Sequence, residues 1–232
     1  MDKFLELNKK IEDFYAVEEQ TWSSVDNLGS GIFVFHDLIP QNCISIIEDV
    51  IENKENNYTY REAMVGYGMK IPDYRDCLDF KYKRSDIEHD NSTHGMMLKK
   101  VWDSLYNKSS PAVKTYCKYF NIGELRYWEA MNFIRYGEGQ HFQEHHDHGY
   151  SYNCVVSLVG YPNDDYEGGE LYFRLQDLKI KPKAGDLFIF PSNFMYPHKA
   201  MPVKSGIKHS IVTMLDFSDK FHKPEFHEET GS

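Results

Sequence analysis

The sequence from 136 to 147 reads Tyr136-Gly-Glu-Gly-Gln-His-Phe-Gln-Glu-His145-His-Asp147. His145 and Asp147 are two positions apart, which places both side chains on the same face of a β-strand. A lone histidine, His198, follows further along the chain. Two imidazoles and one carboxylate can hold non-haem Fe(II) on one face and leave the opposite face open. We therefore predict a metal site at these three residues, with His198 brought alongside by another strand.

Other histidines lie in the same segment, and they leave the identity of the metal open between Fe(II) and Zn(II). These are His141, His146 and His148. Strand alternation points His146 away from a metal that positions 145 and 147 hold. A Zn(II) site built from several of these histidines is the alternative, but the wide separation of His198 fits the Fe(II) arrangement better.

Four blocks of the chain, in this order, resemble the signature of prolyl 4-hydroxylase-like 2-oxoglutarate oxygenases. They are Tyr136–Asp147, Gly168-Gly169-Glu170-Leu171, Gly185–Ser192 and His198–Ser210. The resemblance is clear from about 124 to 217 and weaker from 31 to 80. It implies a distorted double-stranded β-helix, the cupin-like jelly roll. It also implies Fe(II), 2-oxoglutarate and O2 as cofactor and cosubstrates, with ascorbate as a further expected ligand.

The resemblance also assigns the cosubstrate contacts. Lys208 stands ten residues after His198, where family members carry a lysine or arginine that binds the distal carboxylate of 2-oxoglutarate. A dicarboxylate that enters a partly buried site needs a fixed cation. Lysine offers only a point charge, so a hydroxyl is expected to assist it, and Tyr136 and Ser210 are the candidates.

The substrate side departs from the family pattern. Peptidyl-prolyl hydroxylases tend to carry an arginine where this chain has Asn153, and a tryptophan where it has Met214. We expect hydroxylation of an unactivated C–H bond, with a prolyl residue of a peptide or protein as the first candidate. Another side chain or a free amino acid is the alternative within the class. A non-catalytic ligand-binding jelly roll and a nucleic-acid demethylase are the alternatives outside it.

Composition narrows the partners. The chain has 232 residues and a net charge of −10, from 26 basic and 36 acidic side chains. Phosphate contacts need a basic face, so nucleic acid is not expected as the main partner.

No apolar run approaches a membrane span, and the first fifteen residues lack the apolar region of a signal peptide. The four cysteines are widely spaced, which indicates reduced thiols and a cytoplasmic protein. The oligomeric state stays open.

Periodicity predicts a mainly β protein with N-terminal helices packed on one sheet. Expected helices cover 3–20, 40–53, 97–108 and 111–120, and expected strands cover 32–35, 125–136, 152–159, 170–175, 186–190 and 208–217. The first half carries too few apolar residues for a core of its own, so we predict one domain over 1–232. Its expected parts are a helical, lid-bearing segment to about 123, a catalytic core over 124–217 and a tail over 218–232.

Overall fold

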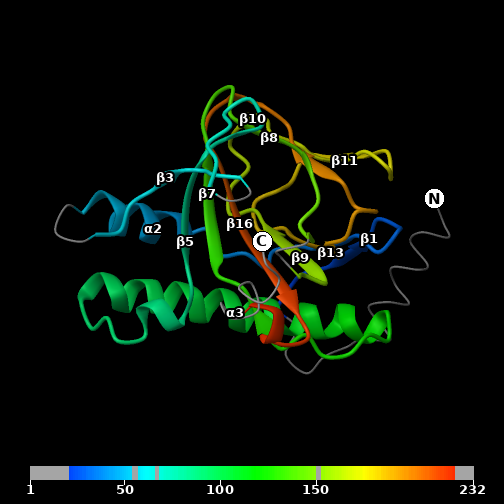
Figure 1. Ribbon diagram of the computed structural model, residues 1–232, viewed down its shortest axis with the longest axis horizontal. Helices are drawn as coiled ribbons and strands as arrows, with labels where there is room; N and C mark the ends of the chain where they lie inside the picture. The colour runs from blue at the N-terminus through cyan, green and yellow to red at the C-terminus, as the bar shows by residue number, and fades with distance from the viewer. Residues whose placement is uncertain (1–20, 54–56, 66–67, 150–152, 223–232) are drawn as a thin grey trace.

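The computed structural model describes residues 21–53, 57–65, 68–149 and 153–222, and the predicted helix over 3–20 lies outside them. Two antiparallel sheets organise the described residues (Figure 1). The major sheet has the order β1 (Val25–Asn27), β2 (Phe33–Phe35), β13 (Leu187–Pro191), β9 (Val156–Gly160), β16 (Lys208–Asp216), β7 (Met131–Tyr136), β5 (Leu78–Tyr82) and β3 (Arg61–Glu62), and β6 (Tyr127–Trp128) also pairs with β16.

The minor sheet supplies two of the predicted metal ligands. Its order is β12 (Leu178–Ile180), β11 (Leu171–Phe173), β14 (His198–Ala200), β8 (His141–His145) and β4 (Arg75–Asp76). A short pair, β10 (Glu167–Gly168) with β15 (Val203–Ser205), stands beside it. The mainly β class with flanking helices is confirmed.

The major sheet is apolar on both faces, and each face has its own partner. Along β13, Leu187 and Ile189 belong to the cluster that includes the helices, whereas Phe188 and Phe190 pack with residues of the minor sheet. This alternation follows from the two-residue period of a strand. Burial on both faces explains why β13 reads as a continuous hydrophobic run.

The helices α2 (Cys43–Glu52) and α3 (Thr93–Tyr119) pack against the major sheet on the side away from the minor sheet (Figure 1). The prediction of separate helices over 97–108 and 111–120 is wrong, because α3 runs through Pro111. Proline removes one helical hydrogen bond. Leu105 and Val113 are buried on either side of it, and this packing holds the helix continuous. Ser92 caps its start by accepting from the Gly95 amide.

One predicted strand is interrupted. The expected strand over 125–136 appears as β6 and β7, separated by Glu129 and Ala130. The Glu129 carboxylate is buried, accepts from the Tyr127 hydroxyl at 2.7 Å and accepts from the Ala130 amide at 3.2 Å. These local hydrogen bonds compete with the regular ladder at this point.

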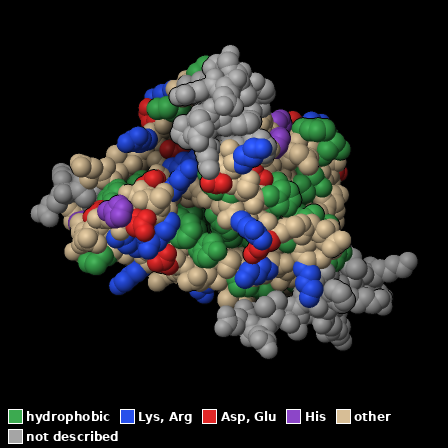
Figure 2. All heavy atoms as spheres, turned by 60° about the horizontal axis from the view of Figure 1, so that its bottom comes forward, with side chains coloured by type: hydrophobic (Ala, Val, Ile, Leu, Met, Phe, Trp, Pro, Cys, Tyr) green, Lys and Arg blue, Asp and Glu red, His purple; other side chains and the backbone are tan. Residues whose placement is uncertain are grey.

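The helix side of the molecule has a mixed surface. In Figure 2, which turns the lower side of Figure 1 forward, basic and acidic side chains are interspersed among hydrophobic ones. None of the helices in the described residues is long and apolar enough to cross a bilayer.

Candidate metal centre and cosubstrate pocket

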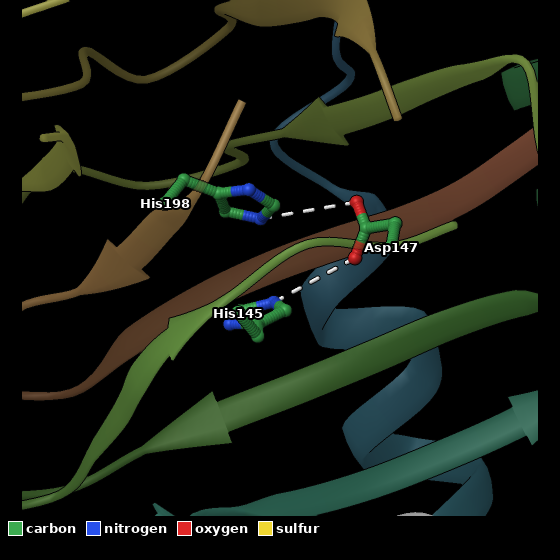
Figure 3. Close-up of side chains that lie close together, drawn as sticks. All are labelled: His145, Asp147 and His198. Atoms are coloured by element: carbon green, nitrogen blue, oxygen red, sulfur yellow. Dashed lines mark ion pairs between the residues drawn. The ribbon is translucent and has the colours of Figure 1, made fainter. Parts of the chain in front are cut away.

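The side chains of His145, Asp147 and His198 point toward one another (Figure 3). His145 Nε2 lies 3.6 Å from Asp147 Oδ1, and His198 Nε2 lies 3.8 Å from Asp147 Oδ2. A cation bound at about 2.1 Å from two ligand atoms allows them to be up to about 4.2 Å apart. These two distances end on different oxygens of Asp147, and both lie within that limit. One ligand atom from each of the three residues lies within 4.8 Å of the other two, so the donor set can converge on one metal ion.

The fold brings the ligands together from two strands and a loop. His145 ends β8 and pairs directly with His198, the first residue of β14. Asp147 lies two residues beyond β8, so the expectation that both close ligands share a strand is wrong for Asp147. Its amide donates to the Ser192 carbonyl at 3.1 Å. Its Oδ2 accepts from the Ser157 hydroxyl at 2.6 Å, which fixes the carboxylate.

The histidine tautomers suit metal binding. His145 Nδ1 lies 2.8 Å from the Gln143 carbonyl, and His198 Nδ1 lies 3.1 Å from the Tyr196 carbonyl. A carbonyl can only accept, so each Nδ1 carries the proton and each Nε2 keeps its lone pair. Such hydrogen bonds orient metal-binding imidazoles. Burial also lowers the pKa of His145 to about 3, which keeps this ring neutral.

A stack of side chains supports His145 from behind. The Phe142 ring lies parallel to the His145 ring, with centroids 3.6 Å apart. The Arg75 guanidinium lies 4.8 Å from the Phe142 centroid on strand β4, which pairs with β8. Arg75 also donates to the Met64 carbonyl and forms an ion pair with Asp79 at 3.2 Å. The imidazole is therefore restrained on the face away from His198.

The metal ligands open into a cavity of about 440 Å³ between the two sheets. Alternate residues of β16 line it, from Lys208 through Ser210 and Val212 to Met214. We call its extremes the Lys208 end and the Met214 end. They are six residues apart along the strand, or about 20 Å at the usual rise. Asp147 is nearer the Met214 end, because its partner Ser157 pairs with Met214.

Lys208 is a buried cation without a described carboxylate within ion-pair distance. Its side chain is 1% exposed, and its Nζ donates to the Gly169 carbonyl at 2.7 Å. The ring centroids of Tyr136 and Tyr161 lie 5.1 and 5.2 Å from Nζ. Burial, and then repulsion from Lys181, lower the pKa of Lys208 to about 7. An anion in this pocket would restore the charge of the amine.

Gly169 shapes this resting position. Its φ of +63° is unfavourable for other residues, and a Cβ there would lie 3.0 Å from Lys208 Cδ and 2.9 Å from the Tyr166 ring. The glycine therefore lets the hairpin approach the stem of Lys208 closely. Gly168-Gly169 stands in one of the quoted blocks, but this contact depends on tertiary packing and could not be read from the sequence.

The two hydroxyl candidates also lie in the cavity. Tyr136 pairs directly with Lys208 across β7 and β16, and Ser210 is the next inward-facing residue of β16. Both side chains are buried. The structure therefore brings the three predicted cosubstrate residues together at the Lys208 end of the cavity.

The other histidines have separate roles. His148 Nδ1 lies 2.8 Å from the Cys154 carbonyl, and His141 lies near the carbonyls of Gly139 and Asp73. His146 lines the cavity but is not in the metal cluster found among the described residues. The histidine-rich segment thus contributes His145 alone to that cluster. Sequence reasoning missed Ser157 and Ser192, although Ser192 stands in one of the quoted blocks.

Comparisons with known proteins agree with this geometry. Residues 131–215 match the model of the 2OG-Fe(II) oxygenase superfamily, a span that contains all the predicted site residues. The predicted resemblance is confirmed. A provisionally named prolyl 4-hydroxylase of Acanthamoeba polyphaga mimivirus is 31% identical over 126 residues, covering 44% of this chain and 52% of that protein. The chain thus matches about half the length of this curated relative.

Solved structures confirm the jelly-roll fold. A prolyl hydroxylase from Trichoplax adhaerens, in complex with a peptide of hypoxia inducible factor, aligns with a TM-score of 0.60 and 13% identity, covering 100% of this chain and 95% of that one. A viral collagen prolyl hydroxylase of Paramecium bursaria Chlorella virus-1, solved as its 2-oxoglutarate complex, aligns with a TM-score of 0.56 and 18% identity. The alignment covers 81% of this chain and 96% of that one. At these identities the solved structures show the fold alone, and the match over 131–215 agrees with the predicted 2-oxoglutarate oxygenase class.

Proposed function

We propose that this chain is an Fe(II)- and 2-oxoglutarate-dependent dioxygenase that hydroxylates a prolyl residue of a peptide or protein. One observation carries the proposal: His145, Asp147 and His198 converge in a cavity whose far end holds the buried Lys208. The names of the relatives support proline as the target. In the reaction, one C–H bond becomes C–OH, and 2-oxoglutarate and O2 are converted to succinate and CO2.

The protein side of this mechanism follows from the contacts. The three ligands would hold Fe(II), which when bound supplies the oxygen-activating chemistry. The Gln143 and Tyr196 carbonyls fix both imidazoles, and Ser157 fixes the carboxylate. Lys208 would anchor the distal carboxylate, with Tyr136 and Ser210 as hydrogen-bond donors. The apolar walls exclude water from the reacting carbon.

A single domain over 1–232, with a lid-bearing part to about 123, a core over 124–217 and a tail over 218–232, is part of this proposal. Ascorbate is proposed as an auxiliary reductant. A cytoplasmic location is proposed because Cys43, Cys77, Cys117 and Cys154 are all buried and free, as reducing conditions favour.

The test is turnover with purified protein, Fe(II), 2-oxoglutarate and O2 against a library of proline-containing peptides. Mass spectrometry should find one added oxygen on proline in at least one peptide, with one succinate formed for each product. Hydroxylation of another side chain would replace proline as the target. The absence of any Fe(II)-dependent 2-oxoglutarate consumption would favour the non-catalytic ligand-binding protein.

A further inference from the structure

Asn132 presents a polar group that the fold leaves unsatisfied. It lies on β7, and its side chain lines the cavity. Its Oδ1 is buried and has no hydrogen-bond partner in the described residues. Buried polar atoms in proteins nearly always have a partner, because an unsatisfied one is destabilising. An atom of this kind inside a ligand cavity indicates a contact that the ligand completes.

The neighbours of Asn132 cannot provide that contact. In the pairing register, Asn132 stands between Lys81 on β5 and Val212 on β16. Val212 and the next inward residue, Met214, carry no hydrogen-bond donor on their side chains. The Lys81 ammonium lies 3.9 Å from the Glu129 carboxylate and does not hydrogen-bond Asn132 Oδ1.

The position of Asn132 assigns this contact to the substrate. Asn132 and Tyr136 lie four residues apart on β7, or about 13 Å at the usual rise. Because Tyr136 pairs with Lys208, Asn132 stands well away from the cosubstrate anchor. It lies toward the Met214 end, on the side where Ser157 holds Asp147.

We propose that the Asn132 carboxamide is a specificity-determining group that hydrogen-bonds a main-chain amide of the substrate. A carboxamide offers an acceptor and two donors, which match the N–H and C=O groups of a peptide bond. This inference rests on the proposed dioxygenase function and defines how the same site recognises a polypeptide.

The charges in the cavity favour an amide over a free amino acid. Among the described residues that line it, the one carboxylate is Asp147, which belongs to the metal cluster. The ammonium group of a free amino acid would therefore be buried without a counter-ion, which is costly. A neutral peptide bond carries no such charge, and Asn132 satisfies its polar atoms.

The first experiment compares Asn132→Leu, which keeps the size of the side chain, with the wild-type protein. Asn107→Leu is the matched control, because Asn107 is exposed on α3 outside the cavity. Blocked proline-containing decapeptides are the probes, alongside free L-proline. We expect Asn132→Leu to raise the peptide KM about tenfold or more, with kcat and the 2-oxoglutarate KM within twofold. The control should match wild type.

A second measurement separates recognition from a structural effect. Replacing single peptide bonds of the best peptide by esters removes one N–H each. One ester should raise the wild-type KM about tenfold and leave that of Asn132→Leu unchanged. An unchanged peptide KM in Asn132→Leu, a loss confined to 2-oxoglutarate, or a preference for free L-proline would each overturn the inference. If no Fe(II)-dependent 2-oxoglutarate consumption occurs in wild type, the proposed function itself fails.

Discussion

The two ends of the cavity are built in opposite ways. At the Lys208 end, the amine donates to Gly169, lies between two tyrosine rings and is almost fully buried. Toward the Met214 end, Asn132 has an unsatisfied oxygen among apolar neighbours on β16. A pre-formed end suits a ligand that never changes, whereas an incomplete end suits a substrate that completes it. The family resemblance follows the same division, since it is intact for the cosubstrate and altered for the substrate.

The metal ligands lie between the two ends, and removing one should have the largest effect. Asp147→Ala and His198→Ala should each abolish Fe(II) binding and turnover, because two ligands hold Fe(II) far less firmly than three. Anaerobic Fe(II) titration with circular dichroism checks binding and folding together. His141→Ala, which alters a partly exposed histidine of β8 outside the cluster, is the control. Full activity in both ligand variants would refute the assignment.

Lys208→Met tests the pre-formed end. It should weaken 2-oxoglutarate binding about ten- to a hundredfold, since a charge-assisted contact contributes about 1.5–3 kcal/mol. Fe(II) affinity should change little. Isothermal titration calorimetry measures the Fe(II) affinity of the metal-free protein under anaerobic conditions and the 2-oxoglutarate affinity of the metal-loaded protein. Lys199→Met is the matched control on neighbouring β14. An unchanged 2-oxoglutarate affinity would move the anchor elsewhere, with Arg135 the next residue to test.

Because the pKa of Lys208 is low, we expect the affinity for 2-oxoglutarate to depend on pH and its binding to be coupled to proton uptake. The pKa is about 7 without cosubstrate, and a carboxylate beside the amine would raise it. Below pH 7 the amine is already charged, so binding takes up few protons. At pH 8 it is mainly neutral, so 2-oxoglutarate binding should take up close to one proton and weaken as pH rises. Calorimetry in buffers of different ionisation enthalpy measures this uptake, and Lys208→Met should lose it. Equal heats in all buffers at pH 8 would contradict the prediction.

The smallest effect is expected in hydrogen exchange, at the described residues of 57–76 that border the cavity. Two groups of amides are compared. The first comprises the described residues 57–65 and 68–76, which include the exposed Met64, Met69 and Ile71. The second is strand β5, which is paired with β7 along its whole length. We expect the amides of the first group that lie outside β3 and β4 and donate no backbone hydrogen bond to exchange fast in the free protein and to slow when a turned-over peptide binds, as a closing lid would. Strand β5 should be protected throughout. Full protection of 57–65 and 68–76 without peptide would contradict the lid.

Sequence reasoning located what depends on local spacing. His145 and Asp147 lie in one short motif, and the alternation of β16 predicts that Lys208 and Ser210 face the same way. It could not locate contacts that depend on strand pairing and packing. The Gly169 carbonyl, the Ser157 hydroxyl and the orphaned Asn132 oxygen are of this kind. The prediction that the helix breaks near Pro111 failed for the same reason. Burial of residues on both sides of Pro111 outweighs the local signal of the proline, and α3 continues through it.

Strand β16 is the last strand of the described chain, yet it lies inside the major sheet and pairs with β9, β7 and β6. The major sheet therefore cannot be completed during synthesis until residue 216 has left the ribosome. The same strand carries Lys208, so the predicted cosubstrate anchor and the completed sheet arise in one late step. Such non-local pairing slows folding. It also means that a growing chain, even with His145 and Asp147 already made, lacks a complete set of the predicted site residues until Lys208 and Ser210 have followed.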